Sequence, residues 1–284
     1  MSRFNLLRVG AVCRRWMVGL CGLWLAAGLH AEPAEVTLGV VPQQSATALA
    51  RVWIPMLSEV AARSGVRLVF RTAPDIPSFE DRLKKGEYDL AYMNPYHYTV
   101  YSQSAGYRAF AKEKDRRLTG LIVVPKDSPV SDITQLAGQK IAFPAPAAFA
   151  ASILPRGEFT RRGIAIDAHY VSSHDSVYRG VAQGLFAAGG GIQRTLNAID
   201  PAVSARLRVL TTTPGYVPHA FAAHPRVAPE VVAKVLAGMI SLADDDTGQA
   251  LLAAFKFKGI EAAADPEWDE IRALGIEQNT GRAR

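Results

Sequence analysis

Short apolar runs alternate with amphipathic segments along the chain from residue 36 onward. Runs at Val36–Val41, Arg67–Arg71 and Asp89–Met93 predict three strands. Apolar positions spaced three and four residues apart predict helices over Ala46–Arg63 and Ser78–Lys85, the second capped by Ser78. This order of strands and helices is typical of a mostly parallel sheet covered by helices.

The alternation repeats in a second block and ends in a helical tail. Further strands are expected at Leu118–Val124, Lys140–Phe143, Ala168–Val171, Leu185–Ala188, Leu207–Thr211 and His219–Ala223. Further helices are expected at Asp132–Ala137, Ala147–Arg162, Asp175–Gln183, Gln193–Ile199 and from Pro229 to the C-terminus. Three consecutive aspartates, Asp244–Asp246, are expected to end or interrupt a helix of this tail.

Two strand–helix blocks of similar size predict an α/β protein of two lobes. Residues 32–119 and 214–284 are expected to form lobe one, and residues 120–213 to form lobe two as an insertion. Two strands, around residues 120–124 and 211–219, would then join the lobes as hinges. A single doubly wound domain is the alternative that the pattern leaves open.

The basic excess of the chain lies mainly in its first 31 residues. The formal net charge of the 284 residues is +6, and Arg3, Arg8, Arg14 and Arg15 all precede the first acidic residue. The rest of the chain is close to neutral, which argues against a nucleic-acid-binding surface.

Residues 1–31 have the order of an export signal. An apolar run, Trp16–Leu29, follows the basic start and leads into the short segment Leu29–Ala31. The run is shorter than the roughly 20 residues that span a bilayer, so we expect a signal peptide cleaved near Ala31 and a periplasmic protein. A retained N-terminal anchor is the alternative, and the pair Arg14–Arg15 leaves the twin-arginine and Sec export routes both open.

Both cysteines, Cys13 and Cys21, lie in that segment. The exported chain would therefore have no disulfide, no cysteine nucleophile and no thiolate metal site. The sequence also lacks the G-x-S-x-G and H-E-x-x-H motifs. We expect a binding protein rather than an enzyme, with no cofactor and no metal, and an exported hydrolase is the least favoured alternative.

Small ligands of parallel α/β sheets bind where strands end and helices begin. Four turns occupy such positions, at Pro42–Ser45, Met93–Tyr96, Phe143–Ser152 and Ser172–Ser176. In the third turn, small side chains leave the first N–H groups of the next helix open to an anion. A tight strand–helix junction is the structural alternative.

The fourth turn carries His174, whose intrinsic pKa of about 6.5 suits it to donate a hydrogen bond to an anion. Asp175 and Ser176 beside it are either ligand contacts or helix caps. The expected ligand contacts are Gln44, Ser45, Asn94, Tyr96, Ala148, Phe149, Ala150, Ala151, His174, Asp175 and Ser176. Gly189–Gly191 lacks the lysine of a phosphate-binding loop, so it indicates close backbone approach instead.

Several motifs resemble those of the phosphate/phosphite/phosphonate-binding (PhnD-like) proteins of ABC importers. They are Trp53-x-Pro55 within Leu38–Met56, Gly86-x-Tyr88-Asp89-Leu90-Ala91-Tyr92, Leu121–Pro129 with Leu136–Gly138 and Lys140–Phe143, and Ser173–Ser176. The resemblance covers nearly the whole chain after residue 31. It implies a type II periplasmic binding fold, with two α/β lobes, two hinge strands and a cleft that closes on a small-molecule anion.

Three departures from the family pattern concern the ligand. The Ser-Thr-Ser run of the family falls on Ala148–Ala150 in this chain. The backbone amides are therefore kept, but the side-chain hydroxyls are absent. Each hydrogen bond to a charged ligand that is lost in this way costs about 1.5–3 kcal/mol of binding free energy. An aromatic position falls on Met93, and a common acid is absent from Leu185–Gly191. Together with Phe149 and Tyr96, these departures predict an organic anion that is larger or more apolar than a simple phosphonate.

We therefore expect a monomeric periplasmic solute-binding protein that delivers an anion to the membrane permease of an ABC importer. The lobes would close on the ligand by a hinge motion. A sensory protein that signals to a membrane histidine kinase is the alternative, because the same cleft would serve either partner.

Overall fold

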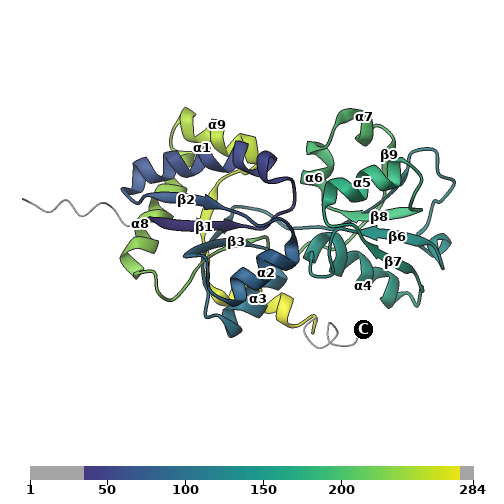
Figure 1. Cartoon of the computed structure of the whole chain (residues 1–284), viewed down its shortest axis with the longest axis horizontal. Helices are drawn as coiled ribbons and strands as arrows, with labels where there is room; N and C mark the ends of the chain where they lie inside the picture. The colour runs from purple at the N-terminus through teal and green to yellow at the C-terminus, as the bar shows by residue number, and fades with distance from the viewer. Residues whose placement is uncertain (1–34, 276–284) are drawn as a thin grey trace, which may run out of the picture. The chain divides into compact units, whose positions relative to one another are not determined.

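Two sheets, built from interleaved stretches of the chain, organise the protein (Figure 1). The computed structural model describes residues 35–275, so the expected signal segment lies outside the described residues. We call the part around the six-stranded sheet, of order β11-β4-β10-β3-β1-β2, lobe one, and the part around the five-stranded sheet, of order β7-β6-β8-β5-β9, lobe two. Lobe one contains β1 (Val36–Val40), β2 (Leu68–Arg71), β3 (Leu90–Met93), β4 (Arg108–Glu113), β10 (Ala220–Ala223) and β11 (Ile260–Ala262). Lobe two contains β5 (Leu121–Pro125), β6 (Lys140–Phe143), β7 (Asp167–Tyr170), β8 (Ala188–Gly191) and β9 (Leu207–Thr212).

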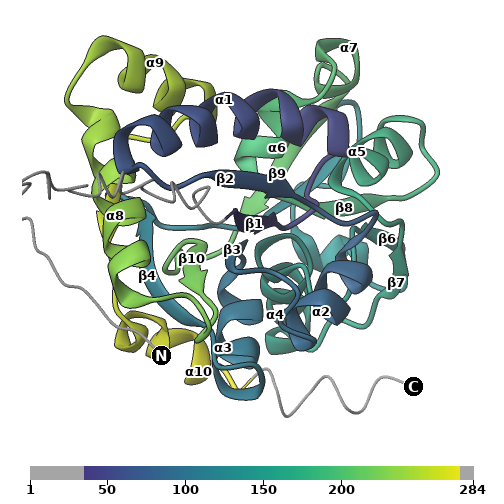
Figure 2. The same ribbon diagram turned by 60° about the vertical axis from the view of Figure 1, so that its left-hand side comes forward.

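Helices cover both faces of each sheet. In lobe one, α1 and α9 lie over one face and α2 and α3 over the other, as both views show (Figure 2). The lobe-one helices are α1 (Ala46–Ser64), α2 (Ile76–Lys84), α3 (Pro95–Ser104), α8 (Pro229–Ile240), η3 (Ser241–Ala243), α9 (Asp246–Phe255), η4 (Asp265–Trp268) and α10 (Asp269–Arg272). The lobe-two helices are η1 (Ile133–Leu136), η2 (Phe149–Ile153), α4 (Leu154–Arg161), α5 (His174–Ala182), α6 (Gln193–Ala198) and α7 (Pro201–Ser204). Within residues 35–275, no helix has both the length and the apolar character that crossing a membrane requires.

The first helix confirms the sequence prediction for Ala46–Arg63 almost residue for residue. Ser45 caps it by accepting a hydrogen bond from the Ala48 amide at 3.2 Å, and Gly65 ends it in the left-handed conformation at φ 69°. Its buried stripe consists of Leu49, Trp53, Met56, Leu57 and Val60. Trp53 is 2% exposed, and its ring centroid lies 4.9 Å from the centroids of both Tyr92 and Phe255. The buried stripe of α1 therefore packs below the ends of β1 and β3.

Parallel pairing is confined to the strand–helix–strand units. β1 pairs in parallel with β2 and β3, and β6 pairs in parallel with β7 and β8. In contrast, β10 runs antiparallel to β3 and β4, and β5 runs antiparallel to β8 and β9. The prediction of mostly parallel sheets is therefore wrong for these strands, because the path of the chain between the lobes sets their direction and the local alternation does not.

The start of α2 differs from the sequence prediction. Asp75, and not Ser78, caps this helix, and its carboxylate accepts a hydrogen bond from the Ser78 amide at 2.8 Å. Pro77 occupies the first turn, where the missing N–H has no helical partner to lose. The helix begins earlier than predicted because an aspartate followed by a first-turn proline is the stronger start signal.

Two strands were not predicted, and a third is displaced. β4 carries Arg108 and Lys112 within an otherwise apolar run, and β11 interrupts a tail that was expected to be entirely helical. The predicted strand Leu185–Ala188 is wrong, since β8 spans Ala188–Gly191 and contains three glycines with low strand propensity. A Cβ atom at Gly190 would lie 1.9 Å from the Ala151 carbonyl oxygen, which confirms the predicted close backbone approach and explains why glycine occupies the strand.

The chain crosses between the lobes twice, and the two crossing segments pair with each other. Leu118 and Tyr216 exchange backbone hydrogen bonds of 2.6 and 3.0 Å. The Thr213 amide donates to the Gly120 carbonyl at 2.9 Å, and the Gly120 amide donates to the Thr213 hydroxyl at 2.9 Å. Because Leu118 belongs to this isolated bridge, β5 begins three residues later than predicted, at Leu121.

Candidate ligand-binding site

The turn that precedes α4 meets lobe one across a small cavity. The cavity has a volume of about 10 Å³, which is room for about one water molecule. Its lining includes the predicted site residues Asn94, Ala148, Phe149, Ala150, Ala151 and His174. Gln43, from the predicted turn Pro42–Ser45 but not among the expected contacts, lines it as well, and so does His219, which was not predicted. The amide nitrogen Nδ2 of Asn94 donates to the Ala147 carbonyl at 3.0 Å, so the two lobes are in direct contact here.

The backbone of this turn is a π-helical segment, η2, that continues into α4. The amides of Ser152 and Ile153 both donate to the Ala148 carbonyl, at 2.7 and 3.2 Å. Within the described part of the chain, the amides of Phe149, Ala150 and Ala151 donate to no carbonyl outside the helix, as expected of a first turn. The predicted single helix Ala147–Arg162 is therefore two segments, and the first presents N–H groups next to the cavity.

Burial favours the neutral form of both histidines of the site. Burial lowers the pKa of His174 to about 3, with Arg194 adding to the effect, so the expectation that His174 titrates near 6.5 is wrong. Burial also lowers the pKa of His219 well below its ordinary value. His174 Nδ1 lies 3.1 Å from the Thr195 hydroxyl, and His219 Nε2 lies 3.0 Å from the Gln43 amide nitrogen. These side chains therefore bring hydrogen-bonding atoms to the cleft without positive charge.

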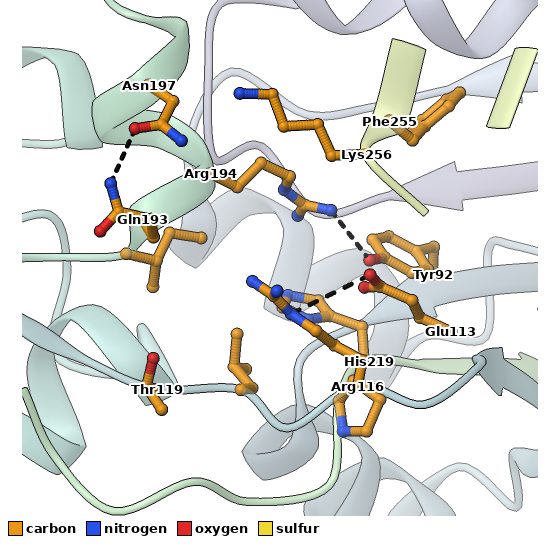
Figure 3. Close-up of a pocket in the computed structure, with 13 residues that line it drawn as sticks. Tyr92, Glu113, Arg116, Thr119, Gln193, Arg194, Asn197, His219, Phe255 and Lys256 are labelled. Atoms are coloured by element: carbon orange, nitrogen blue, oxygen red, sulfur yellow. Dashed lines mark hydrogen bonds and ion pairs between the residues drawn. The ribbon is translucent and has the colours of Figure 1, made fainter. Parts of the chain in front are cut away.

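Arg194 brings a positive charge to the cleft from lobe two (Figure 3). It lies in the first turn of α6, directly after β8, and its guanidinium reaches across to lobe one. Nη2 donates to Gln43 Oε1 at 2.6 Å, and Nη1 donates to the Tyr92 hydroxyl at 3.3 Å. Among residues 35–275, no carboxylate forms an ion pair with Arg194. The sequence prediction missed this residue because it placed the strand before it three residues too early.

Two further cations and one acid surround the same cleft (Figure 3). Arg116, Lys256 and Glu113 line a cavity of about 90 Å³ together with Arg194. Glu113 is 8% exposed, its carboxylate lies 3.9 Å from Arg116 Nε, and burial raises its pKa although Arg194 and Arg116 oppose that change. The cavity therefore has more positive than negative groups on its walls.

A larger cavity of about 230 Å³ adjoins this one, and the two share part of their walls. The shared residues are Tyr92, Arg194, Asn197, Phe255 and Lys256. Trp53 and Leu49 of α1 supply much of its apolar floor, and Gln44, a predicted site residue, lies at its wall.

The structure places the other predicted site residues outside these three cavities. Ser45 is the cap of α1, and Tyr96 is buried in α3 with 8% exposure. Asp175 and Ser176 occupy the first turn of α5, but the cap of that helix is Ser173, whose hydroxyl accepts from the Ser176 amide at 3.0 Å. Met93 is fully buried in β3 and contributes to the core of lobe one.

Two α/β lobes, two paired crossing segments and a cleft with converging polar groups define a type II periplasmic binding protein. A family model described as ABC transporter, phosphonate, periplasmic substrate-binding protein matches residues 38–268. The chain therefore belongs to this family of periplasmic substrate-binding proteins of ABC transporters, and it has the fold that the sequence resemblance implied.

Solved structures with the same fold are similar over most of their length. A binding protein component of an ABC phosphonate transporter from Pseudomonas aeruginosa aligns with a TM-score of 0.80 at 15% identity, over 87% of each chain. PhnD1 from Prochlorococcus marinus, in complex with methylphosphonate, aligns with a TM-score of 0.79 at 16% identity, over 87% of this chain and 99% of that one. XAC2383 from Xanthomonas citri, bound to ATP, aligns with a TM-score of 0.69 at 20% identity, over 88% and 99%. At these identities the likeness concerns the fold.

Proposed function

We propose that this substrate-binding protein captures an organic or inorganic oxyanion beside Arg194 and presents it to the permease of an ABC importer. The observation that carries the proposal is the half-buried guanidinium of Arg194, whose hydrogen-bond partners in the described chain, Gln43 and Tyr92, are both neutral. A guanidinium partly withdrawn from water gains more from an anionic acceptor than from neutral oxygens. An arriving anion would exchange with Gln43 and Tyr92 as the partner of Arg194.

The amides of Phe149, Ala150 and Ala151 would supply the second set of donors. They lie across the small cavity from Asn94 and beside the neutral His174. Because the cavity has room for about one water, we propose that ligand entry widens it and that Asn94 exchanges its bond to Ala147 for the ligand. Gln44, Ser45, Tyr96, Asp175 and Ser176 stay predictions as ligand contacts.

Capture would involve a hinge motion of the lobes. We propose that residues 32–119 and 214–284 move as lobe one and residues 120–213 as lobe two, with the paired segments around Leu118 and Tyr216 as the hinge. A ligand that contacts both lobes stabilises the closed form through its differential affinity for that form.

The ligand test uses a panel of anions on the purified protein. Inorganic phosphate, sulfate, methylphosphonate, phenylphosphonate and benzoate are compared by thermal shift and titration calorimetry. A ligand present at 100 times its dissociation constant should stabilise the fold by about 2.7 kcal/mol.

Arg194→Gln should weaken the binding of that ligand by about tenfold or more, because a hydrogen bond to a charged group contributes about 1.5–3 kcal/mol. Arg206→Gln, a change at an exposed lobe-two arginine, is the matched control. Equal affinity in all three proteins, or binding of none of these anions, would refute the proposal.

The partner test uses the loaded protein. Stimulation of the ATPase activity of a reconstituted ABC permease by the ligand-bound form supports the importer role. Stimulation of a membrane histidine kinase in place of the permease would replace it with the sensory role. Turnover of ester substrates by the purified protein would overturn the non-enzymatic assignment.

Export and oligomeric state complete the proposal. We propose that the chain is exported with cleavage after Ala31 and acts as a monomer. N-terminal sequencing of the protein recovered from the periplasm tests the first point, and light scattering during size-exclusion chromatography tests the second. A retained N-terminus or a stable dimer would overturn the corresponding statement.

A further inference from the structure

Lys256 has a backbone conformation that its side chain disfavours. It follows α9 as the C-terminal cap, in the left-handed region at φ 59° and ψ 32°, and its amide donates to the Leu252 and Ala253 carbonyls. Glycine is the usual residue at such a position because a Cβ atom is strained there. Gly65 and Gly163 meet the same requirement at other turns of this chain. The fold alone would therefore be served better by glycine at position 256.

The charge of Lys256 also has no structural partner. Within residues 35–275 its ammonium group forms no hydrogen bond or ion pair, whereas Lys112 of the same lobe pairs with Glu261 and Glu267. The side chain instead lines both cleft cavities, and in Figure 3 it extends from the end of α9 toward Asn197 on α6. A strained and unpaired lysine that reaches over a cavity points to a role in that cavity.

The walls of the cleft show which chemistry would use it. Among the described residues, Lys256, Arg194, Arg116 and Arg51 contribute four positive charges to these walls, and Glu113 is the one carboxylate. The larger cavity, of about 230 Å³, has an apolar floor that includes Trp53 and Phe255, which are 2% and 5% exposed. This combination suits a ligand with an apolar body and more than one anionic group.

We propose that Lys256 forms a second anionic subsite, so that the ligand is an organic anion with two separate negatively charged groups and an apolar or aromatic body between them. One group binds at Arg194, the body lies against Trp53 and Phe255, and the second group reaches Lys256. The inference rests on the proposed anion capture at Arg194, but it specifies a ligand that a lone oxyanion site does not require.

The test compares two probes that differ by one charge. Phenylphosphonate carries the first anionic group and an aromatic ring, and 4-phosphonobenzoate adds a carboxylate at the far end of the ring. In the wild type the added carboxylate should increase the affinity by about fivefold, which is the contribution of an ion pair at a partly exposed site. Higher salt concentration should reduce this gain, because it screens the ion pair. Lys256→Gly and Lys256→Gln should abolish this gain, and they should lower the affinity for phenylphosphonate much less than Arg194→Gln does.

Stability supplies an independent measurement on the same variants. Lys256→Gly should raise the thermal midpoint of the unliganded protein, because glycine relieves the left-handed strain, while it removes the gain from the second charge. Lys258→Gln, at an exposed lysine that lines neither cavity, should change neither property. If the Lys256 variants bind the two probes with the wild-type ratio, the subsite is refuted while capture at Arg194 stands. If neither probe nor any anion of the panel binds, the subsite and the proposed function both fail.

Discussion

Asn94 of lobe one and Ala147 of lobe two are joined by a hydrogen bond of 3.0 Å, from the side-chain amide to the main-chain carbonyl. The same asparagine caps α3, since its Oδ1 accepts from the His97 amide at 2.8 Å. The side chain of Asn94 thus starts a helix in lobe one and contacts the backbone of lobe two. The contact lies beside the turn that carries the amides of Phe149, Ala150 and Ala151, which we call the amide turn. Asn94 is 3% exposed, so both of its roles are played in a nearly dry environment.

These two roles can be separated by substitution. Asn94→Asp keeps the oxygen that caps α3 but places a carboxylate against the Ala147 carbonyl, so the closed arrangement should be disfavoured by about 1–3 kcal/mol. Asn94→Ala should lose the cap as well, at a cost of about 1 kcal/mol in the free energy of unfolding. Small-angle scattering should show a larger radius of gyration for Asn94→Asp in the absence of ligand. An unchanged radius would show that this bond does not hold the lobes together.

Buried neutral histidines should make the fold sensitive to acid. Burial lowers the pKa of His97 to about 3, and the pKa of His174 is likewise about 3, whereas an unfolded histidine has a pKa of about 6.5. The unfolded state therefore takes up protons first as the pH falls below about 6.5. The contribution of each buried histidine to the free energy of unfolding is fully present above that pH. It should be lost as the pH falls toward 3, at about 1.4 kcal/mol per pH unit for each histidine.

Urea unfolding between pH 7.5 and 4.5 measures this slope. His174→Gln should reduce the slope of the free energy of unfolding against pH by the contribution of one buried histidine. His169→Gln, at a half-exposed side chain on the edge strand β7, serves as the control. An equal slope in the wild type and in His174→Gln would contradict the assignment of His174 as a buried neutral histidine.

Glu80 should have the opposite pH dependence. Burial raises its pKa to about 7, with the neighbouring Asp81 adding to the effect, and its carboxyl oxygen lies 3.5 Å from His97 Nε2. Because the folded pKa lies above the unfolded value, the contribution of Glu80 is present at low pH and is lost as the pH rises through 7. Glu80→Gln, which resembles the protonated acid, should raise the free energy of unfolding at pH 8 by roughly 1–3 kcal/mol. The same comparison at pH 4.5 should show little difference, and equal effects at both values would exclude this explanation.

Gly190 should be the glycine of β8 on which the amide turn depends most. A Cβ atom there would lie 1.9 Å from the Ala151 carbonyl oxygen and 2.7 Å from the Phe143 ring. Gly190→Ala should therefore displace the turn, lower the free energy of unfolding by about 1–3 kcal/mol and weaken anion binding. Gly157→Ala is the matched control, since nothing lies within 4 Å of its added methyl group and alanine favours the helix α4. Thermal unfolding and titration calorimetry compare the stability and the anion affinity of the two variants. If Gly190→Ala matched Gly157→Ala in both properties, the turn would tolerate the methyl group and the prediction would be wrong.

The sequence pointed to part of the site for a physical reason. Turns after buried strands converge in α/β folds, so Asn94, the amides of Ala148–Ala151 and His174 could be brought together on local pattern alone. The charge of the cleft could not be predicted in this way. Arg194 follows a strand made of glycines, and Lys256 ends a helix of the tail, so neither stands at a position where periodicity singles out a functional residue.

The sequence by itself determined which segments form the strand–helix–strand units, because apolar spacing and capping residues act within a few turns of the chain. It also determined the amide-rich turn, because small residues after a strand leave the N–H groups open. Only the tertiary structure decided that β4, β5, β9 and β10 run antiparallel to neighbours, and that three cations from distant segments face one cleft. Strand direction and charge convergence depend on where the chain crosses between the lobes, and that path is set by long-range packing rather than by local pattern.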